Sequence, residues 1–110
     1  MITFDDFKKV DIRVGTVVES NKNDKSNKPS LILMIDFGYK IGLKKTSAQL
    51  VDNYKPKDLI GKQVAAVVNF PPKQIGKMVS EVLVLGFPDE NNNPILIIPS
   101  KKVINGGKLF

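Results

Sequence analysis

The side chains of this chain are suited to binding rather than to covalent chemistry. The sequence has 110 residues and includes neither His nor Cys. His is the commonest general base and metal ligand, and Cys supplies thiol nucleophiles and zinc ligands. Ser-His-Asp and Cys-His catalysis are therefore impossible, and any metal would need carboxylate ligands alone. We expect a protein that is not an enzyme and that uses no metal or cofactor.

A rigid apolar ledge is predicted where Asn69-Phe70-Pro71-Pro72 ends a run rich in Val and Ala. Proline cannot donate a hydrogen bond to a sheet, so a strand must stop there. Phe70 beside the two prolines could contact an extended peptide or stack on a nucleobase. In the alternative interpretation, Phe70 packs in the core and Asn69 satisfies the backbone of a turn. We also expect Ser80 to brace the ledge by a hydrogen bond to Asn69.

Polar and polarisable side chains accompany this ledge. Met78 is adaptable, as residues of promiscuous binding surfaces often are, and Glu81 would suit a basic peptide. Ser47 follows a strand-like run, where it could lie on a binding rim or cap a turn. Gln49 could bond to a peptide backbone or hold the same turn. The predicted peptide-binding residues are Lys44, Ser47, Gln49, Asn69, Phe70, Pro71, Pro72, Met78, Ser80 and Glu81.

Cations exceed anions by 17 to 11, which gives a net charge of +6, and all cations except Arg13 are Lys. A Lys-rich surface can follow nucleic-acid phosphates or serve only as a solubilising coat. Asp11 and Arg13 lie two residues apart on a predicted strand, so both point to one face. They either line a binding groove or form an ion pair that fixes the strand or a dimer contact. The predicted RNA-binding residues are Arg13, Lys44, Lys45, Lys73 and Lys77.

The pattern of elements predicts a single all-β domain over residues 1–110. Short apolar or alternating runs are separated by Gly, Pro and Asn, and Gly15 inside the first strand indicates a bulge or sharp bend. The expected elements are a helix at 3–9, strands at 10–19, 31–37, 39–44, 63–70, 80–85 and 95–98, a helix or turn at 46–54, and loops at 21–30, 55–62 and 73–79. A short N-terminal helix and a short helix between strands are typical of a five-stranded Greek-key barrel of the OB type.

Apolar residues are frequent near both ends of the chain. A monomer of this size would leave many of them exposed, and exposed apolar patches often mark an interface. We expect a homodimer whose interface uses Ile2, Phe4, Phe7, Val103, Ile104, Leu109 and Phe110. The first residues lack the basic region and apolar core of a signal peptide, and no apolar run is long enough to cross a bilayer. These features predict a cytoplasmic protein without membrane insertion.

Three segments resemble the tRNA-binding-domain family, an OB-fold family whose members occur alone or fused to methionyl-tRNA synthetases. They are residues 7–15, which contain Asp-Ile-Arg-Val-Gly, the Ser-Ala-Gln element at 47–49, and residues 67–86 with the Asn-Phe-Pro-Pro turn. The last two segments and the total length are similar to the CsaA-type branch of this family, which consists of small export-related chaperones.

The resemblance implies an OB-fold homodimer without catalytic activity. It implies binding of unfolded or precursor polypeptides and of the translocation ATPase SecA, whereas other relatives bind the outer corner of tRNA by its shape. The chain departs from the RNA-binding relatives at 73–77, where they carry Arg and a later Gly, and at 82–83, where they carry Gly-Met. These departures favour the chaperone branch. We therefore expect an export chaperone that holds polypeptides in apolar pockets, with tRNA binding as the alternative.

Overall fold

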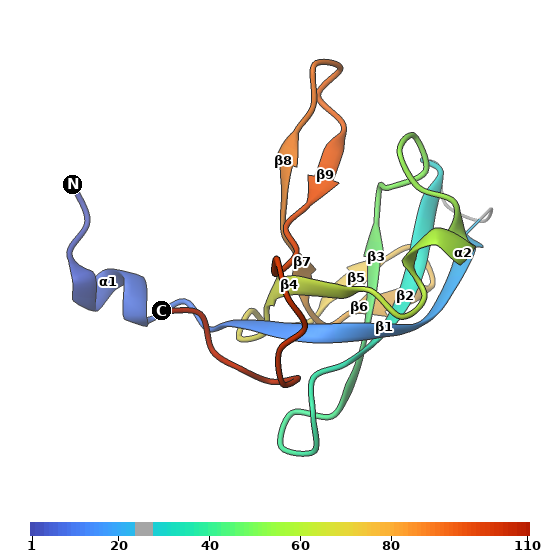
Figure 1. The fold of residues 1–110 in the computed structure, drawn as a ribbon. Coiled ribbons are helices and arrows are strands. Elements are labelled where there is room, and N and C mark those ends of the chain that lie inside the picture. Colours follow the sequence, from blue (N-terminus) through green and yellow to red (C-terminus); the bar gives the residue numbers. More distant parts are fainter. Residues whose placement is uncertain (24–27) are drawn as a thin grey trace.

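A curled five-stranded antiparallel sheet forms the centre of the fold (Figure 1). The computed structural model describes residues 1–23 and 28–110, so the middle of the predicted loop at 21–30 lies outside the described residues. The strands lie in the order β3-β2-β1-β4-β7. Their bounds are β1 (Ile12–Asn23), β2 (Ser30–Asp36), β3 (Leu43–Ala48), β4 (Gln63–Val67) and β7 (Leu83–Val84). The predicted all-β fold is confirmed, with the sheet rolled into a half-barrel.

β1 is long enough to pair with two neighbouring strands. Residues 12–16 pair with β4, and residues 16–23 pair with β2. The register with β2 shifts between Val17 and Glu19, and such a bulge bends a strand and increases its twist. The sequence predicted the bulge or bend at Gly15, but the bulge lies further along β1, between Val17 and Glu19. Gly15 is paired regularly and instead permits a close approach between β1 and β2.

The core lies on the inner face of the half-barrel. Leu31, Leu33, Ile35 and Phe37 point inward at every second position of β2 and just after it, and each is at most 1% exposed. This alternation follows from the period of two in a strand that has one buried face. Leu59 joins the same cluster from outside the sheet. Large apolar side chains at alternate positions therefore give β2 a clear strand pattern in the sequence.

The N-terminal helix α1 (Phe4–Lys8) lies where the sequence predicted a helix. Its first turn is closed by Thr3, whose hydroxyl accepts a hydrogen bond from Asp6 N at 3.1 Å. The Asp6 carboxylate accepts one from Thr3 N at 3.0 Å in return, and this bond lowers the pKa of Asp6. No residue of α1 is buried, and Figure 1 shows the helix projecting away from the sheet. Local capping rather than core packing therefore determines α1.

The second helix lies later than predicted. α2 (Pro56–Leu59) begins with a proline, a favoured residue in the first turn of a helix. The helix or turn predicted at 46–54 is wrong at its start, because residues 46–48 belong to β3, and only residues 51–53 form a turn. The predicted loop at 55–62 instead contains α2. No helix within residues 1–23 and 28–110 is long and apolar enough to cross a membrane.

Two short hairpins form separate two-stranded sheets. The first consists of β5 (Lys73–Ile75) and β6 (Met78–Ser80), so the loop predicted at 73–79 is wrong. The second consists of β8 (Gly86–Pro88) and β9 (Pro94–Leu96) and projects from the sheet in Figure 1. The strand predicted at 80–85 is interrupted, since it contains the last residue of β6 and the short β7.

The C-terminal tail runs along the edge of β1 that β2 leaves free. Val14 N donates to Gly107 O at 3.2 Å, Gly106 N donates to Val14 O at 2.8 Å, and Leu109 N donates to Ile12 O at 2.8 Å. These bonds cover an otherwise open strand edge, which would be prone to pair with another chain. They also bring the last residues close to the start of β1 (Figure 1).

Candidate ligand-binding site

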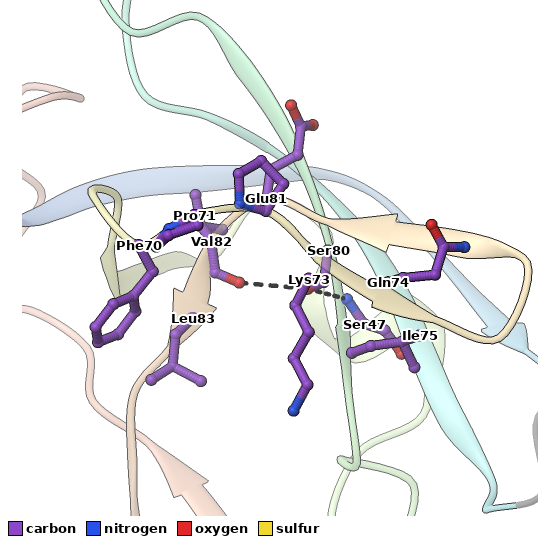
Figure 2. Close-up of a pocket in the computed structure, with 11 residues that line it drawn as sticks. Ser47, Phe70, Pro71, Lys73, Gln74, Ile75, Ser80, Glu81, Val82 and Leu83 are labelled. Atoms are coloured by element: carbon purple, nitrogen blue, oxygen red, sulfur yellow. Dashed lines mark hydrogen bonds between the residues drawn. The ribbon is translucent and has the colours of Figure 1, made fainter.

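An apolar groove with a volume of about 700 Å3 lies beyond the end of β4 (Figure 2). It is bounded by the segment after β4, the β5–β6 hairpin, β3 and the start of β7. Its surface is mostly apolar, with polar groups at intervals. The lining residues are Ser47, Phe70, Pro71, Pro72, Lys73, Gln74, Ile75, Ser80, Glu81, Val82 and Leu83. The structure therefore brings together six of the ten predicted peptide-binding residues, namely Ser47, Phe70, Pro71, Pro72, Ser80 and Glu81.

The apolar ledge at 70–72 forms one wall of the groove. Phe70 is 52% exposed, and both prolines are exposed as well. Figure 2 shows Phe70, Lys73 and Leu83 pointing to the same side of the chain. Phe70 thus does not pack in the core. An aromatic ring beside two conformationally fixed prolines offers apolar surface that loses little entropy when a ligand covers it.

Asn69 fixes the start of the ledge by hydrogen bonds to a neighbouring segment and does not line the groove. Its Oδ1 accepts a hydrogen bond from Asp11 N at 2.9 Å, and its Nδ2 donates to Lys9 O at 2.8 Å. Val68 N donates to Asp11 O at 2.8 Å in the same region. The turn after β4 is therefore tied to the residues that precede β1, as in the alternative interpretation of Asn69.

Ser80 is buried beneath the groove, where it joins β6 to β3. Its hydroxyl lies 2.9 Å from Thr46 Oγ1 and accepts a hydrogen bond from Ser47 N at 3.2 Å. Thr46 Oγ1 also donates to Val82 O at 2.7 Å. The predicted bond between Ser80 and Asn69 is therefore wrong, because both side chains are engaged elsewhere. Buried hydroxyls at this position close the half-barrel where strand pairing is incomplete.

Glu81 also joins the two sides of this closure. Its Oε1 accepts a hydrogen bond from Lys45 N at 2.9 Å, while Glu81 N donates to Lys45 O at 2.8 Å. The carboxylate thus replaces one backbone acceptor of a strand pair. Figure 2 shows this carboxylate pointing away from the side to which Phe70 points. The negative charge therefore lies beside the groove rather than at its centre.

A second hollow of about 490 Å3 adjoins the groove and shares Pro72 and Glu81 with it. Its lining residues are Ile32, Lys45, Pro72, Lys77, Met78, Val79 and Glu81. Met78, which the sequence placed in the peptide site, therefore lies here rather than in the groove. Lys45 and Lys77 meet in this hollow, whereas Lys73 lines the groove. Three of the five predicted RNA-binding residues thus surround the ledge.

Lys44 and Gln49 line neither hollow. Lys44 and Lys45 are consecutive on β3, so their side chains point to opposite faces of the sheet. Only Lys45 shares the outer face with Ser47. The alternation of the strand thus separates Lys44 from Lys45, although both were predicted to bind RNA.

Arg13 is engaged with the C-terminal tail. Its Nε lies 2.6 Å from Asp11 Oδ1, and its Nη1 donates to Gly106 O at 2.9 Å. Both side chains of the pair are only about a quarter exposed (28% and 25%). This geometry corresponds to the alternative in which the ion pair fixes the strand. The guanidinium has few donors left for a phosphate, and its role in RNA binding stays a prediction.

Four groove residues, Gln74, Ile75, Val82 and Leu83, were not identified from the sequence. Gln74 and Ile75 were assigned to a loop, but Ile75 and Met78 flank Gly76-Lys77, and Gly76 has a φ of +61°. Two apolar residues on either side of a two-residue turn with Gly indicate a hairpin. This signal would have placed Ile75 on a strand that borders the groove.

The predicted interface residues form two groups. Val103, Ile104, Leu109 and Phe110 line one hollow of about 660 Å3 on the tail. Ile104 is 88% exposed, and the walls of the hollow are almost entirely apolar. Ile2, Phe4 and Phe7 lie in or before α1 and do not line this hollow. An open apolar hollow of this kind is typical of a surface that binds another protein.

Residues 12–108 match the family model described as "Putative tRNA binding domain". The chain therefore belongs to the tRNA-binding-domain family. Its fold is similar to that of the chaperone CsaA from Bacillus anthracis str. Ames, with a TM-score of 0.94 and 44% identity over 100% of this chain and 99% of the other. The CsaA chaperone protein from Picrophilus torridus gives a TM-score of 0.92 and 46% identity over 100% of both chains. These similarities confirm the OB-type fold and the resemblance to the CsaA-type branch.

Methionine–tRNA ligases are among the curated relatives of this chain. The ligase of Parabacteroides distasonis is 36% identical over 110 residues, and that of Methanococcoides burtonii is 40% identical over 106 residues. The matches cover 98% and 96% of this chain but only 16% and 15% of the ligases. The chain therefore spans about a sixth of the length of these relatives, and the similarity concerns one segment of each. Within the described residues, no three His, Cys, Asp or Glu side chains are grouped as a metal site would require.

Proposed function

We propose that this protein is a CsaA-like molecular chaperone that binds unfolded or precursor polypeptides for protein export. The observation that carries the proposal is the groove of about 700 Å3, in which Phe70 stays half exposed beside Pro71 and Pro72. Water around such an apolar surface is released when a partner covers it, which favours binding. The similarity to two CsaA chaperones over the whole chain supports the same function.

The arrangement of the two hollows suits an extended polypeptide. They share Pro72 and Glu81 in their linings, so one chain can pass from the first hollow into the second. Successive side chains of an extended peptide point in opposite directions, and alternate apolar side chains can therefore enter the hollows. Met78 in the second hollow accommodates side chains of different shape. Binding of this kind needs apolar character in the ligand but no defined sequence.

The charges around the ledge complement a precursor segment. Glu81 provides an anion for the basic region that begins many exported precursors. Lys45, Lys73 and Lys77 attract acidic residues elsewhere in an unfolded chain. The proposed partners are therefore unfolded or precursor polypeptides, with the translocation ATPase SecA as the protein that receives them.

We propose further that the protein acts in the cytoplasm as a homodimer. The apolar hollow on the tail supports the dimer, because the free energy falls when a second copy covers water-exposed residues such as Ile104 and Phe110. A two-fold dimer carries two grooves. Two grooves on one particle raise the avidity for a long unfolded chain without any new contact.

Binding of tRNA is the second candidate function. It is supported by the family match across residues 12–108. The net charge of +6 and the lysines around the ledge would attract phosphates. Both candidate functions require binding and no catalysis.

The groove is tested by Phe70→Ala in a fluorescence titration with a labelled segment of about 30 residues from a precursor N-terminus. The substitution removes the ring surface that a bound peptide would cover, so binding should weaken about tenfold, or ~1.4 kcal/mol. Phe87→Ala is the matched control, because Phe87 is also exposed but lies on β8, outside the groove. Its affinity should equal that of the wild-type protein.

Equal binding by Phe70→Ala and the wild-type protein would contradict the proposed groove. Competition with unfractionated tRNA at physiological salt gives a second readout. If tRNA displaces the peptide fully, both ligands use the same surface. Peptide that stays bound under excess tRNA shows that the two surfaces are separate.

A further inference from the structure

A basic pocket lies at the opposite end of β4 from the groove. It has a volume of about 390 Å3 and includes Lys62, Lys101 and Lys102 in its lining. Ser100 and Gln63 add polar groups, and none of the lining residues is acidic. Lys62 comes immediately before β4, whereas the ledge follows its other end. The chain thus carries a second concentration of cations, distinct from the lysines around the ledge.

Hydrogen bonds hold one wall of the basic pocket in place. Gln63 Nε2 donates to Val103 O at 2.7 Å, and Val103 N donates to Gln63 Oε1 at 3.0 Å. Thr16 Oγ1 lies 2.8 Å from Asn105 Oδ1, which also accepts a hydrogen bond from Gln63 Nε2 at 3.0 Å. Pro99 restricts the backbone on the other side of residues 100–102. This exposed segment is therefore anchored at both ends.

The three lysine ammonium groups of the basic pocket and the donors of residues 100–102 have no partner in the described part of the chain. No ion pair there involves Lys62, Lys101 or Lys102. The backbone N–H groups of residues 100–102 make no hydrogen bond there either, and the Ser100 hydroxyl is likewise open. A hollow whose lining includes three lysines and no carboxylate is suited to an anionic ligand.

Lysine side chains favour the phosphates of a nucleic acid as this anion. An ammonium group acts as a compact point charge that attracts a phosphate from any direction, without the fixed fork of Arg. Phosphate contacts position a nucleic acid but do not read its bases. Several lysines on an open bend can therefore contact a phosphate backbone, and the family match at 12–108 favours RNA.

We infer that the basic pocket binds phosphate groups of an RNA backbone, so that RNA and a polypeptide bind the protein at the same time. The polypeptide part of this inference rests on the proposed chaperone function. The four steps along β4, at about 3.3 Å each, separate the two ends by roughly 13 Å. The Debye length at physiological ionic strength is only about 8 Å. Charges at one end therefore affect a ligand at the other end weakly.

The test compares two variants that each lose three positive charges. One is Lys62→Gln/Lys101→Gln/Lys102→Gln, and the matched control is Lys45→Gln/Lys73→Gln/Lys77→Gln. Binding of unfractionated tRNA and of the labelled precursor segment is measured by fluorescence anisotropy between about 50 and 200 mM salt. All six lysines are exposed, so both variants should fold like the wild-type protein, which circular dichroism verifies.

The basic-pocket variant should bind tRNA at least tenfold more weakly and lower the slope of log K against log salt by about 2. The control variant should change tRNA affinity less than threefold, and excess tRNA should leave the labelled peptide bound to the wild-type protein. Equal or larger losses in the control variant would overturn the basic pocket as the RNA site. So would absence of tRNA binding to the wild-type protein at 50 mM salt, or a loss of peptide rather than tRNA affinity in the basic-pocket variant.

These outcomes are independent of the proposed groove. A failed groove appears as unchanged peptide binding by Phe70→Ala, whatever the lysine variants do. A failed basic pocket appears in the titrations of the lysine variants, in which Phe70 is unchanged.

Discussion

Asp89 shapes the turn of the β8–β9 hairpin. Its Oδ1 accepts hydrogen bonds from Asn91 N at 2.8 Å and from Asn93 N at 2.9 Å. Its Oδ2 accepts one from Asn53 Nδ2 at 3.0 Å, which joins the hairpin to the turn after β3. The bond from Asn93, followed by that from Asn53, lowers the pKa of Asp89 below its ordinary value of 3.8.

The lowered pKa predicts a pH-dependent effect of Asp89→Asn. A carboxylate with a depressed pKa in the folded state stabilises the fold above the unfolded pKa, and this contribution is lost as pH falls through the folded value. Asp89→Asn should therefore lower the unfolding temperature at pH 7. The difference from the wild-type protein should shrink as the pH falls below about 3.8. Thermal unfolding followed by circular dichroism between pH 2 and pH 7 measures it.

Glu90→Gln removes the same charge next to Asp89 without breaking these hydrogen bonds. It should leave the pH profile of stability close to that of the wild-type protein. A difference between Asp89→Asn and the wild-type protein that persists unchanged at pH 2 would show that the charge of Asp89 is not responsible.

Individual site residues were predictable where the local sequence determines the backbone. Phe70 with its two prolines is such a case, because Pro ends a strand whatever its surroundings. The partners of Ser80 and Asn69 were not predictable. They lie more than 30 residues away along the chain, on Thr46 and Lys9. Only the curling of the sheet brings such residues together.

Among the elements, β1 and β2 depend on the absence of a side chain at Gly15. A Cβ atom there would lie 2.6 Å from Ile35 Cγ2 and 2.9 Å from Asp36 O. Gly15→Ala should therefore lower the free energy of unfolding by about 1–3 kcal/mol, since the core must shift to make room. Chemical denaturation in urea measures the change.

Gly107→Ala serves as the control for this substitution. A Cβ atom at Gly107 would make contacts of 3.4 Å or more, and its φ is not in the left-handed region. Its stability should stay near that of the wild-type protein. If both variants lose equal stability, a general effect of Ala for Gly is responsible rather than the packing of β1 on β2.

The elements were predictable where a hydrophobic pattern is strong. Every second residue from Leu31 to Phe37 is buried, as a half-buried strand requires. The segment at 46–54 was not, because Thr46 and Ser47 tolerate both a helix start and a strand. Thr46 is in a strand because it pairs with Leu33 and its hydroxyl donates a hydrogen bond to Val82 O. Tertiary contacts thus overrule local preference at this position.

At the scale of the whole molecule, the apolar tail hollow predicts self-association. The wild-type protein should sediment as a dimer, and Ile104→Asp should sediment as a monomer, because a charge in an apolar interface is costly to bury. Sedimentation equilibrium over a range of concentrations distinguishes the two states. Ile104 is exposed in the single chain, so the variant should keep its fold.

Ile60→Asp is the matched control, since Ile60 is 53% exposed and lies outside the tail hollow. It should remain a dimer. A wild-type protein that stays monomeric at all concentrations would contradict the proposed interface, as would a dimer that Ile104→Asp leaves intact.

β4 carries the ledge at one end and the basic pocket at the other, although it is only five residues long. Its side chains between these ends include Val64 and Ala66, which belong to the core. Residues on either surface can therefore be substituted without changing the core residues that stabilise the fold. A short strand of this kind therefore allows the sequence of one surface to change without altering the other surface or the core between them.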